Sequence, residues 1–528
     1  MKMKTVLENI SKLSGSKEGL IFIIAISAFI KILILIVSND QAINPDGVRY
    51  ISAAQQFAFG HFKEAIAIYP MPLYPLLIAC IHFVIPDWVL AARLISSFSL
   101  VLVVIPLYFL TADLFDRKAA FWACLAFTLA PLPNEWVINV IRDPGYVLFF
   151  VWTVHFAQRA LRSPQLTYFY LAVISFWIAT GFRIEGIIFI PVYFFFLVWL
   201  TISVPQQRSH FFIGILVWTA IPVFLFVMLL LFISPEQAYF NRVDQVMQEV
   251  KNLIQLRFLD NYHLIYQQLK VLEDQSAYTG FGKYNLVAIA RHHMLILYLF
   301  GLLESLIKVL FPFFALPLLF GFKRPLLRNQ RLVIALVISY ILMVYYYALK
   351  VDYVRTRFLF APAMLLFPWV GAGLERLFDR TQECSKQTLL AVVFAGIFIV
   401  APLGKIAQSV VKQDNVIVKT GEWLAAQPDF KNTRIVTNDP RIAFYAGRET
   451  YTRKKKTIIY HSIRHDYSGI EKFALENKGD IIIIRTSTER LKLLPDLKKF
   501  AKVKEFKGKK KIAVIFYSRK YQTTQMPK

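Results

Sequence analysis

Long apolar runs separated by short charged loops dominate the chain. Runs such as Leu20–Val37, Phe211–Ile233 and Leu332–Leu349 reach or approach the roughly 20 residues that a helix needs to cross a bilayer. We count about eleven such runs, so the pattern predicts a mainly α, polytopic transmembrane helical protein. The predicted spans lie near residues 20–38, 93–114, 119–133, 144–160, 166–181, 186–204, 211–233, 296–321, 331–349, 358–375 and 388–405.

The loops between these spans carry an asymmetric charge. When the N-terminus is placed inside, alternate loops become cytoplasmic, and each of them contains at least one Lys or Arg, as the positive-inside rule expects. These residues are Arg117 and Lys118; Arg159 and Arg162; Arg208; Lys323, Arg324, Arg328 and Arg331; and Arg376, Arg380 and Lys386. The basic N-terminus lacks a small-residue cleavage site, so we expect an uncleaved first span rather than a signal peptide.

Composition narrows the class of protein further. Of the 528 residues, 57% are hydrophobic and only 18% are charged, which is more apolar surface than a soluble domain can bury and too much for a disordered chain. The net charge of +26 would otherwise suggest a nucleic-acid partner, but basic residues flanking membrane spans explain it. Cys80, Cys124 and Cys384 show no metal-ligand spacing and exclude a disulfide framework.

Three segments on the outer side are too long to be simple connectors. We expect a transmembrane domain over residues 1–406, with large outer loops at 38–92 and 234–292, followed by a soluble α/β domain over 407–528. From Lys412 onward this tail contains 27 Lys and Arg against 12 Asp and Glu, and short β-like runs alternate with helical stretches. The β-like runs are Arg434–Thr437, Ile481–Arg485 and Ile512–Tyr517, with a helix over Gly469–Asn477.

The most informative segment is the first outer loop, where Asn44-Pro45-Asp46-Gly47-Val48-Arg49-Tyr50 follows the first span. A carboxylate held in a Pro-Asp-Gly turn at the outer membrane surface is placed to meet a lipid headgroup or a hydroxyl acceptor. The alternative interpretation is that Asp46 only makes an Asx turn or caps the next helix.

Two further segments place charges at the outer ends of spans. In Arg142-Asp143-Pro144-Gly145, the aspartate is either a functional group or a helix N-cap, because proline suits the first turn of a helix. In Gly181-Phe182-Arg183-Ile184-Glu185-Gly186, the two charges lie near lipid, where ionisable residues suggest function. An Arg183–Glu185 pair could equally be a structural clasp.

A basic outer loop, Lys350-Val351-Asp352-Tyr353-Val354-Arg355-Thr356-Arg357, lies on the side that the positive-inside rule does not explain. A phosphate ligand would explain it, because guanidinium groups pair with phosphate through two parallel hydrogen bonds. The alternative is that these side chains only snorkel into water. Outer carboxylates and outer arginines thus share one membrane face, which suits an active site for an anionic, membrane-anchored substrate.

The order of these segments resembles a known family. After the first span come Asp46-Gly47-x-x-Tyr50, the segment Tyr69-Pro70-Met71-Pro72-Leu73-Tyr74-Pro75, Ala92-Arg93-Leu94, Leu114-Phe115-x-Arg117, Arg142-Asp143, and later Arg357-Phe358-Leu359-Phe360-Ala361-Pro362. This order is similar to that of the GT-C superfamily of membrane glycosyltransferases, in the branch of the dolichyl-phosphate-mannose protein mannosyltransferases and the bacterial aminoarabinose transferases. The tail segment Val436-Thr437-Asn438-Asp439-Pro440-Arg441 also resembles the soluble domain of bacterial members.

The resemblance implies an inverting transfer of a sugar from a polyprenyl-phosphate donor to an acceptor glycan, lipid or protein. It makes Asp46 the catalytic carboxylate and Asp143 the second acidic site. The residues expected to bind the donor phosphate are Arg142, Arg183, Lys350, Arg355 and Arg357. The residues expected to contact substrate are Tyr50, Lys63, Glu64, Tyr69, Tyr74 and Glu185.

Two departures from the family pattern matter. The family often has Asp-Glu where this chain has Asp46-Gly47, so any role of a second carboxylate passes to Asp143 or Glu64. Aminoarabinose transferases have a Lys where this chain has Tyr69, so Lys63 or the 350–357 loop is expected to replace a donor-phosphate contact. No cofactor is required by the pattern, and a divalent metal is left open.

Two other classes of protein compete with the enzyme. A transporter or lipid-linked-sugar flippase should show pseudo-repeated halves and broken helices near the bilayer midplane, and the sequence shows neither. A scaffold whose tail is the working part would not need Asp46 and Arg357 on the same face. The pattern favours an enzyme of a bacterial cytoplasmic membrane, with its site and its tail on the outer side.

Span parity generates a topological prediction. Because every predicted inner loop is basic, residues 407–528 should lie outside the cytoplasm. A reporter that is active only in the cytoplasm, fused after Lys528, should therefore be silent, whereas the same reporter fused after Arg208 should be active. Activity of the fusion after Lys528 would move the candidate site to the other face.

Overall fold

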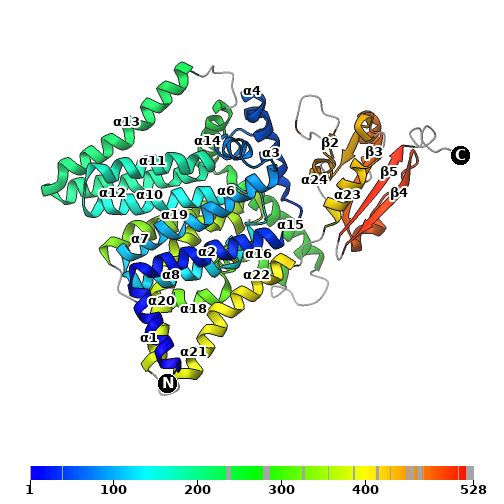
Figure 1. Cartoon of the computed structure of the whole chain (residues 1–528). Coiled ribbons are helices and arrows are strands. Elements are labelled where there is room, and N and C mark those ends of the chain that lie inside the picture. The colour runs from blue at the N-terminus through cyan, green and yellow to red at the C-terminus, as the bar shows by residue number, and fades with distance from the viewer. Residues whose placement is uncertain are drawn as a thin grey trace. The chain divides into compact units, whose positions relative to one another are not determined.

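The computed structural model of the chain is mainly helical with a small sheet near its end (Figure 1). It describes residues 2–38, 40–232, 239–276, 286–323, 327–354, 356–383, 387–411, 415–427, 430–447, 451, 457–460, 467, 469–508 and 511–518. The chain forms two compact units that interleave along the sequence. Unit 1 comprises Met1–Ile30, Phe98–Asn134 and Asp143–Lys405, and unit 2 comprises Lys31–Ser97, Glu135–Arg142 and Ile406–Lys528.

Among the described residues, ten α-helices of the first part of the chain, apart from those between residues 45 and 82, lie between Lys2 and Phe232. Their bounds are α1 Lys2–Gly15, α2 Lys17–Val37, α6 Trp88–Leu102, α7 Val104–Leu114, α8 Arg117–Leu129, α9 Pro131–Glu135, α10 Asp143–Arg162, α11 Leu166–Phe182, α12 Phe189–Ser203 and α13 Arg208–Phe232. Short 3-10 turns, Ile184–Ile188 and Pro205–Gln207, join α11 to α12 and α12 to α13.

The remaining helices of this part follow α13 along the chain. Their bounds are α14 Tyr239–Ile254, α15 Asp260–Ser276, α16 Leu286–His292, α17 Met294–Leu310, α18 Pro312–Phe322, α19 Arg331–Val351, α20 Phe360–Glu383, α21 Gln387–Ala395 and α22 Ala401–Val411. Helix α20 is the most enclosed of the apolar ones, with 94% of its most apolar window buried. It packs closely on α18, where a side-chain carbon at Gly321 would come within 2.0 Å of the Trp369 carbonyl oxygen.

Several helices are long and apolar enough to cross a membrane. Among the described residues six stretches qualify by length and composition: Lys17–Val37, Trp88–Leu114, Ile184–Ser203, Arg331–Val351, Thr356–Thr381 and Thr388–Ala425, the last of which includes residues outside the described ones. A pair bent by 83°, Leu286–His292 and Met294–Leu310, adds a seventh if it is one span. These helices agree with an integral membrane protein, and the total of about eleven spans stays a prediction.

Two predicted spans differ in detail from the helices. The span predicted over 119–133 contains α8, which has 13 residues and ends at Leu129 before the short α9. The span predicted over 296–321 is divided at Phe311, whose φ of 80° lies in the left-handed region and separates α17 from α18. Proline follows at position 312 and starts the new helix, as proline does in the first turn.

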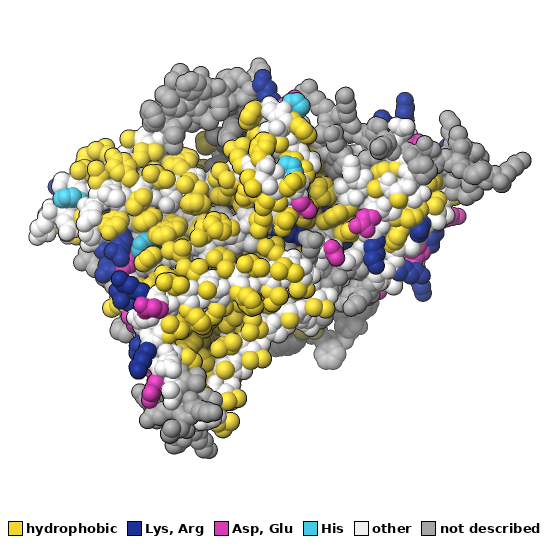
Figure 2. All heavy atoms as spheres, in the orientation of Figure 1, with side chains coloured by type: hydrophobic (Ala, Val, Ile, Leu, Met, Phe, Trp, Pro, Cys, Tyr) yellow, Lys and Arg dark blue, Asp and Glu magenta, His cyan; other side chains and the backbone are white. Residues whose placement is uncertain are grey.

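Large apolar side chains cover the outside of the helical unit. Ile21, Phe29, Phe195 and Ile202 are each between 65% and 71% exposed, which is unusual for a protein surface facing water. Figure 2 shows hydrophobic side chains spread over these helices, with Lys and Arg gathered along one edge. Exposed apolar helices with a basic edge are typical of a protein surrounded by lipid.

The first outer loop is helical within unit 2. It contains α3 Pro45–Ala58, α4 Phe62–Ile68 and α5 Leu73–His82, so the loop predicted over 38–92 is a folded helical segment. Helix α3 follows Asn44, whose extended backbone breaks from the preceding chain, and Pro45 occupies its first position.

The tail folds as a small α/β sheet, as the alternating runs predicted. Five strands have the order β2-β1-β3-β5-β4, with β1 parallel to β2 and β3, and with β5 antiparallel to β3 and β4. Their bounds are β1 Ile435–Thr437, β2 Thr457–Ile459, β3 Ile481–Ser487, β4 Phe500–Lys507 and β5 Lys511–Ser518, and the helices are α23 Val416–Ala425, α24 Pro440–Tyr445 and α25 Ile470–Glu476.

Both faces of the sheet are covered. Ile481 and Ile483 point to the face that packs on α23 and α24, whereas Ile482 and Ile484 point to the face that packs on α25. This alternation is the period of two that a strand imposes on its side chains, with both faces apolar because both are buried.

Candidate active site

Asp46 lies in the first turn of α3 and is half-buried. The turn before it is fixed by Asn44, whose side-chain oxygen accepts a hydrogen bond from the Val140 backbone N–H at 2.9 Å. Gly47 packs directly on the same segment, because a side-chain carbon there would lie 2.8 Å from the Cβ of Val140. The position that carries a second carboxylate in the resembling family therefore has no space for one here.

The tail domain also holds this turn. The Ile43 N–H donates to the Tyr445 hydroxyl at 3.0 Å, and Arg441 donates to the Ile43 carbonyl oxygen at 3.2 Å. Arg441 is fixed in turn by Asp439 at 2.6 Å, which also binds Arg485 at 2.9 Å. Burial alone would raise the pKa of Asp439, but the charges of the two arginines hold that pKa below its ordinary value.

Arg49 and Tyr451 lie beside Asp46 on unit 2. Arg49 donates to the Ile68 carbonyl oxygen at 3.1 Å, and its guanidinium lies 5.7 Å from the centre of the Tyr451 ring. The pKa of Tyr451 is raised, first by burial and then by the nearby Asp46 carboxylate, although the Arg49 charge lowers it. The hydroxyl of Tyr451 thus stays protonated near Asp46 and can donate a hydrogen bond.

Tyr50, Tyr69 and Tyr74 form one buried aromatic group under α3. The ring of Tyr50 meets those of Tyr69 and Tyr74 edge-on, with centroids 4.8 Å and 5.4 Å apart. Arg142 lies over Tyr69 at 5.4 Å, and its Nη1 is 2.9 Å from the Met71 sulfur. Four residues predicted to be at the site, the three tyrosines and Arg142, are thus brought together, whereas Lys63 and Glu64 lie exposed on α4.

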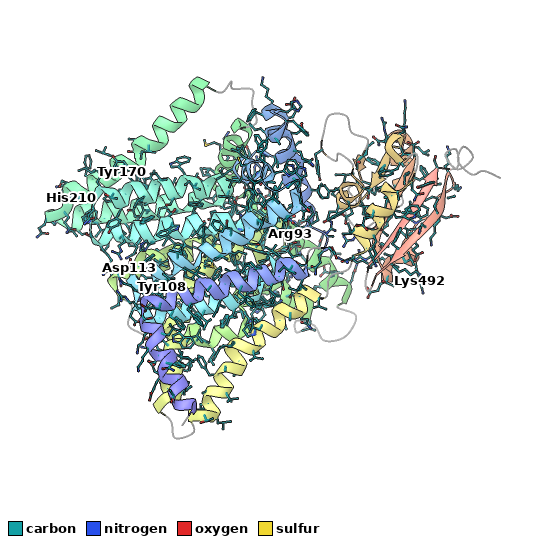
Figure 3. All side chains as sticks on the ribbon, in the orientation of Figure 1. Arg93, Tyr108, Asp113, Tyr170, His210 and Lys492 are labelled. Atoms are coloured by element: carbon teal, nitrogen blue, oxygen red, sulfur yellow. The ribbon has the colours of Figure 1, made fainter. Side chains whose placement is uncertain are left out.

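Arg93, which belongs to the segment Ala92-Arg93-Leu94 of the family resemblance but had no predicted role at the site, fixes the backbone around it (Figure 3). It is 2% exposed and donates to three backbone carbonyls, those of Gln41 at 2.6 Å, Ile138 at 2.7 Å and Ser38 at 3.3 Å. The sequence contained a signal, a charge inside the apolar run after Trp88, but the predicted span began at residue 93 and so placed the charge at the membrane surface.

In unit 1, Arg183 joins two carboxylates that are far apart in the sequence. Its Nη2 lies 2.6 Å from Glu185 Oε1, and its Nη1 donates to Asp143 Oδ1. The side chains of Arg183 and Asp143 are 5% and 3% exposed, whereas that of Glu185 is 29% exposed. A structural Arg183–Glu185 ion pair is one of the two alternatives that the sequence left open, and this ion pair is present.

Aromatic residues enclose the Asp143–Arg183–Glu185 cluster. The Arg183 guanidinium lies 5.2 Å from the Phe358 ring and 5.9 Å from the Tyr146 ring. Tyr340 hydrogen-bonds to Tyr146 and donates to the Glu185 carbonyl oxygen at 3.2 Å. The cavity left beside these residues has a volume of about 20 Å³, which is enough for a water molecule and not for a sugar.

The predicted basic loop is divided between two environments. Arg357 lines the same small cavity as Asp143 and Arg183, with its guanidinium 5.5 Å from the Phe358 ring. Lys350 lies at the end of α19 and binds Glu249 of α14, with 2.7 Å between Nζ and Oε2. That contact holds the pKa of Glu249 below its ordinary value against the effect of burial. Arg355 lies outside the described residues.

No group of three or more His, Cys, Asp and Glu side chains that could hold a metal ion occurs among the described residues. Asp143 and Glu185 are both held by Arg183.

Comparison with known proteins gives one family match and several structures with a similar fold. Residues 69–229 match the family model described as dolichyl-phosphate-mannose-protein mannosyltransferase. This segment begins at the Tyr69 motif and includes Arg142, Asp143, Arg183 and Glu185. No curated protein matches the sequence.

Solved structures of two membrane enzymes share the fold. The oligosaccharyltransferase AglB from Archaeoglobus fulgidus, tethered with an acceptor peptide, matches with a TM-score of 0.59 and 14% identity over 90% of this chain and 70% of its own. The same protein with an inhibitory peptide and a dolichol-phosphate matches with a TM-score of 0.57 and 13% identity, over 89% and 69%. ArnT from Cupriavidus metallidurans, bound to undecaprenyl phosphate, matches with a TM-score of 0.57 and 12% identity over 94% and 97%.

The family match and the shared fold agree with the resemblance that the sequence predicted. The family model includes the second and third charged segments singled out in the sequence, and the structural matches extend over nearly the whole chain, including its tail. Together they confirm the predicted resemblance: residues 69–229 match that family, and the chain shares the fold of AglB and ArnT.

Proposed function

We propose that the protein transfers a sugar from a polyprenyl-phosphate donor to an acceptor at the outer face of the membrane, with inversion at the anomeric carbon. Asp46 is the general base in this reaction, and residues 407–528 lie on the same outer side, in a bacterial cytoplasmic membrane. The related structures support the donor class, because AglB was solved with a dolichol-phosphate and ArnT with undecaprenyl phosphate.

The proposal rests on the difference in exposure and in bound partners between Asp143 and Asp46. Asp143 is 3% exposed, and its carboxylate is already bound by Arg183, so an acceptor hydroxyl cannot reach it. Asp46 is half-buried in the first turn of α3, where both the tail and the 135–142 segment fix the preceding backbone. A base needs both access to a substrate and a fixed position, and Asp46 combines the two.

The chemistry follows from that position. The Asp46 carboxylate takes the proton from the acceptor hydroxyl as its oxygen attacks the anomeric carbon, and the bond from that carbon to the phosphate oxygen breaks. Backside attack inverts the configuration, and the electron pair leaves with the lipid phosphate. The growing negative charge on the phosphate needs preorganised cations, and the outer arginines are the groups proposed to supply them.

Asp143 acts indirectly in this scheme. It fixes Arg183 and, through Arg183, the half-exposed Glu185, which faces the same small cavity as Arg357. Arg357 carries the second positive charge that lines this cavity, and we infer that it faces the donor phosphate. We assign Asp143 a positioning role and Glu185 and Arg357 a substrate-facing one.

The substitution Asp46→Asn tests the base. Asparagine keeps the size and the turn-forming hydrogen bonds of aspartate but cannot accept a proton, so transfer should fall by roughly 10²-fold or more. The measurement is transfer of labelled sugar from a polyprenyl-phosphate donor to envelope acceptors in membranes, with the amount of inserted protein held equal.

Asp40→Asn is the matched control for this test, because Asp40 is an exposed aspartate of the same outer loop. It should transfer sugar at the normal rate. Normal transfer by Asp46→Asn as well would show that Asp46 is only a turn or cap residue and would reject it as the base.

Arg357 provides a test of donor binding. If it grips the phosphate through two parallel hydrogen bonds, Arg357→Lys should raise the apparent KM for the donor by about tenfold, because lysine keeps the charge but loses the bidentate contact. Donor titrations of transfer should be compared with those of Arg208→Lys, an exposed arginine in a predicted inner loop. An unchanged donor KM in both Arg357→Lys and Arg357→Ala would remove Arg357 from the site.

Arg183→Met tests the positioning role of the cluster. The substitution leaves the Asp143 carboxylate buried without its cation, which typically destabilises a protein by about 3–5 kcal/mol. Thermal unfolding in detergent should therefore occur at a clearly lower temperature than in wild type, whereas Arg208→Met should change it little. The double substitution Arg183→Met with Asp143→Leu should recover much of the loss, and no recovery would contradict the assigned pairing.

A further inference from the structure

A second cavity lies in unit 1, apart from Arg183 and its partners. It has a volume of about 330 Å³, at the lower end of the range for small-ligand pockets, and lies where α10 ends, α12 ends and α13 and α19 begin. Its polar lining comes from Gln158, Arg162, Gln207 and Asn329, and its aromatic lining includes Trp199 and Phe211. None of these residues has a part in the proposed transfer.

The ends of these helices lie on one side of the membrane according to the sequence. They include the basic loops at 159–162 and 208 that were predicted to face the cytoplasm. The structure brings the loop at 159–162 together with the start of α19, because Arg159 binds Asp113 at 2.6 Å and Asn329 donates to the Asp113 carbonyl oxygen at 2.9 Å. Figure 3 places Asp113 and His210 at this same end of the helices.

Two amide oxygens in the cavity wall lack hydrogen-bond partners. Gln158 is 3% exposed, and its Oε1 has no partner among the described residues. The Oδ1 of Asn329 is also buried without a described partner, although the Nδ2 of the same side chain is bound. A buried acceptor without a donor costs free energy, so a ligand that donates hydrogen bonds here would be stabilised.

Arg162 gives the same cavity a positive charge. Its Nη1 donates to the Asp113 carbonyl oxygen at 2.9 Å, and no ion pair of the described residues includes it. Its neighbour Arg159 is already neutralised by the Asp113 carboxylate. The cavity therefore offers one cation for an anion and two acceptors for a hydrogen-bond donor, beside aromatic rings of the type found at the membrane interface.

We propose that this cavity binds the headgroup of a phospholipid at the membrane face opposite the transfer site. The lipid phosphate pairs with Arg162, and the headgroup's ammonium or hydroxyl groups donate to Gln158 and Asn329. Trp199 and Phe211 contact the glycerol and upper acyl region. A headgroup that combines a phosphodiester with hydrogen-bond donors fits the polar groups, and a choline headgroup, which has no donor, does not.

The test is native mass spectrometry of the full-length protein in detergent. Phosphatidylethanolamine, phosphatidylglycerol and phosphatidylcholine with identical acyl chains are added at equal concentrations. We expect wild-type protein to retain one molecule of phosphatidylethanolamine or of phosphatidylglycerol about tenfold better than phosphatidylcholine. The better retained of the two lipids shows whether an ammonium or a hydroxyl group donates the hydrogen bonds.

Substitutions in the cavity wall test whether the lipid binds in this cavity. Arg162→Gln and Gln158→Leu should each reduce the selective retention by about tenfold, whereas Arg208→Gln, which removes an exposed charge from the same predicted face but not from the cavity, should leave it unchanged. Equal retention of the three lipids by wild type, or undiminished selectivity in both cavity variants, would overturn the proposal. If Arg162→Gln does not fold, the wild-type competition and Gln158→Leu still decide.

Discussion

The hydrogen bonds of the buried Arg93 guanidinium are the interaction on which unit 2 depends. Charged groups at membrane depth are costly, and they persist where the surrounding structure satisfies them. Arg93 is satisfied by carbonyl oxygens from two separate segments, residues 38–41 and Ile138. It therefore fixes the backbone that leads to Asp46 against the backbone that leads to Arg142, although the two segments are about a hundred residues apart in the sequence.

Neighbouring hydrogen bonds hold the same two backbone segments together. Ser96, one helical turn after Arg93, donates to the Ile141 carbonyl oxygen at 2.8 Å, and Asn44 accepts from Val140. The tail adds Tyr445 and Arg441, which hold Ile43 from the other direction. The tail domain thus has a structural connection to the candidate site, because its α24 contacts the residue three positions before Asp46. That connection gives a physical reason for the tail to be part of the same chain as the candidate site.

The sequence predicted those parts of the site that depend on local structure. Pro144 indicated that a helix begins next to Asp143, and α10 begins at Asp143 itself. The i, i+2 spacing of Arg183 and Glu185 allowed an ion pair, which is present. The Asp143–Arg183 contact could not be predicted in this way, because it depends on how α10 and α11 pack, and a pattern of apolar positions specifies a buried face but not its partner.

The tail shows the same division between local and non-local information. The runs of isoleucine and valine at β3 and β5 are buried on both faces and were recognised as strands. Strand β4, which carries Lys502, Lys504 and Lys507, was not, because it is an edge strand whose charged residues face solvent and weaken the alternation. The strand β2 has only three residues and forms by pairing with β1. Its own residues give no pattern from which that pairing could be predicted.

Gly47 shows how the fixed backbone restricts the chemistry. A glutamate at this position would drive its Cβ to within 2.8 Å of Val140, and Val140 cannot move away without breaking the hydrogen bonds that Arg93, Ser96 and Asn44 make to its segment. The carboxylate that the resembling family often has here is thus excluded by packing. Asp143 cannot replace it, because Arg183 already occupies its carboxylate. In the proposed reaction the proton of the acceptor hydroxyl therefore goes to Asp46 at the start of α3, and the same close packing that excludes a carboxylate at position 47 holds Asp46 in place.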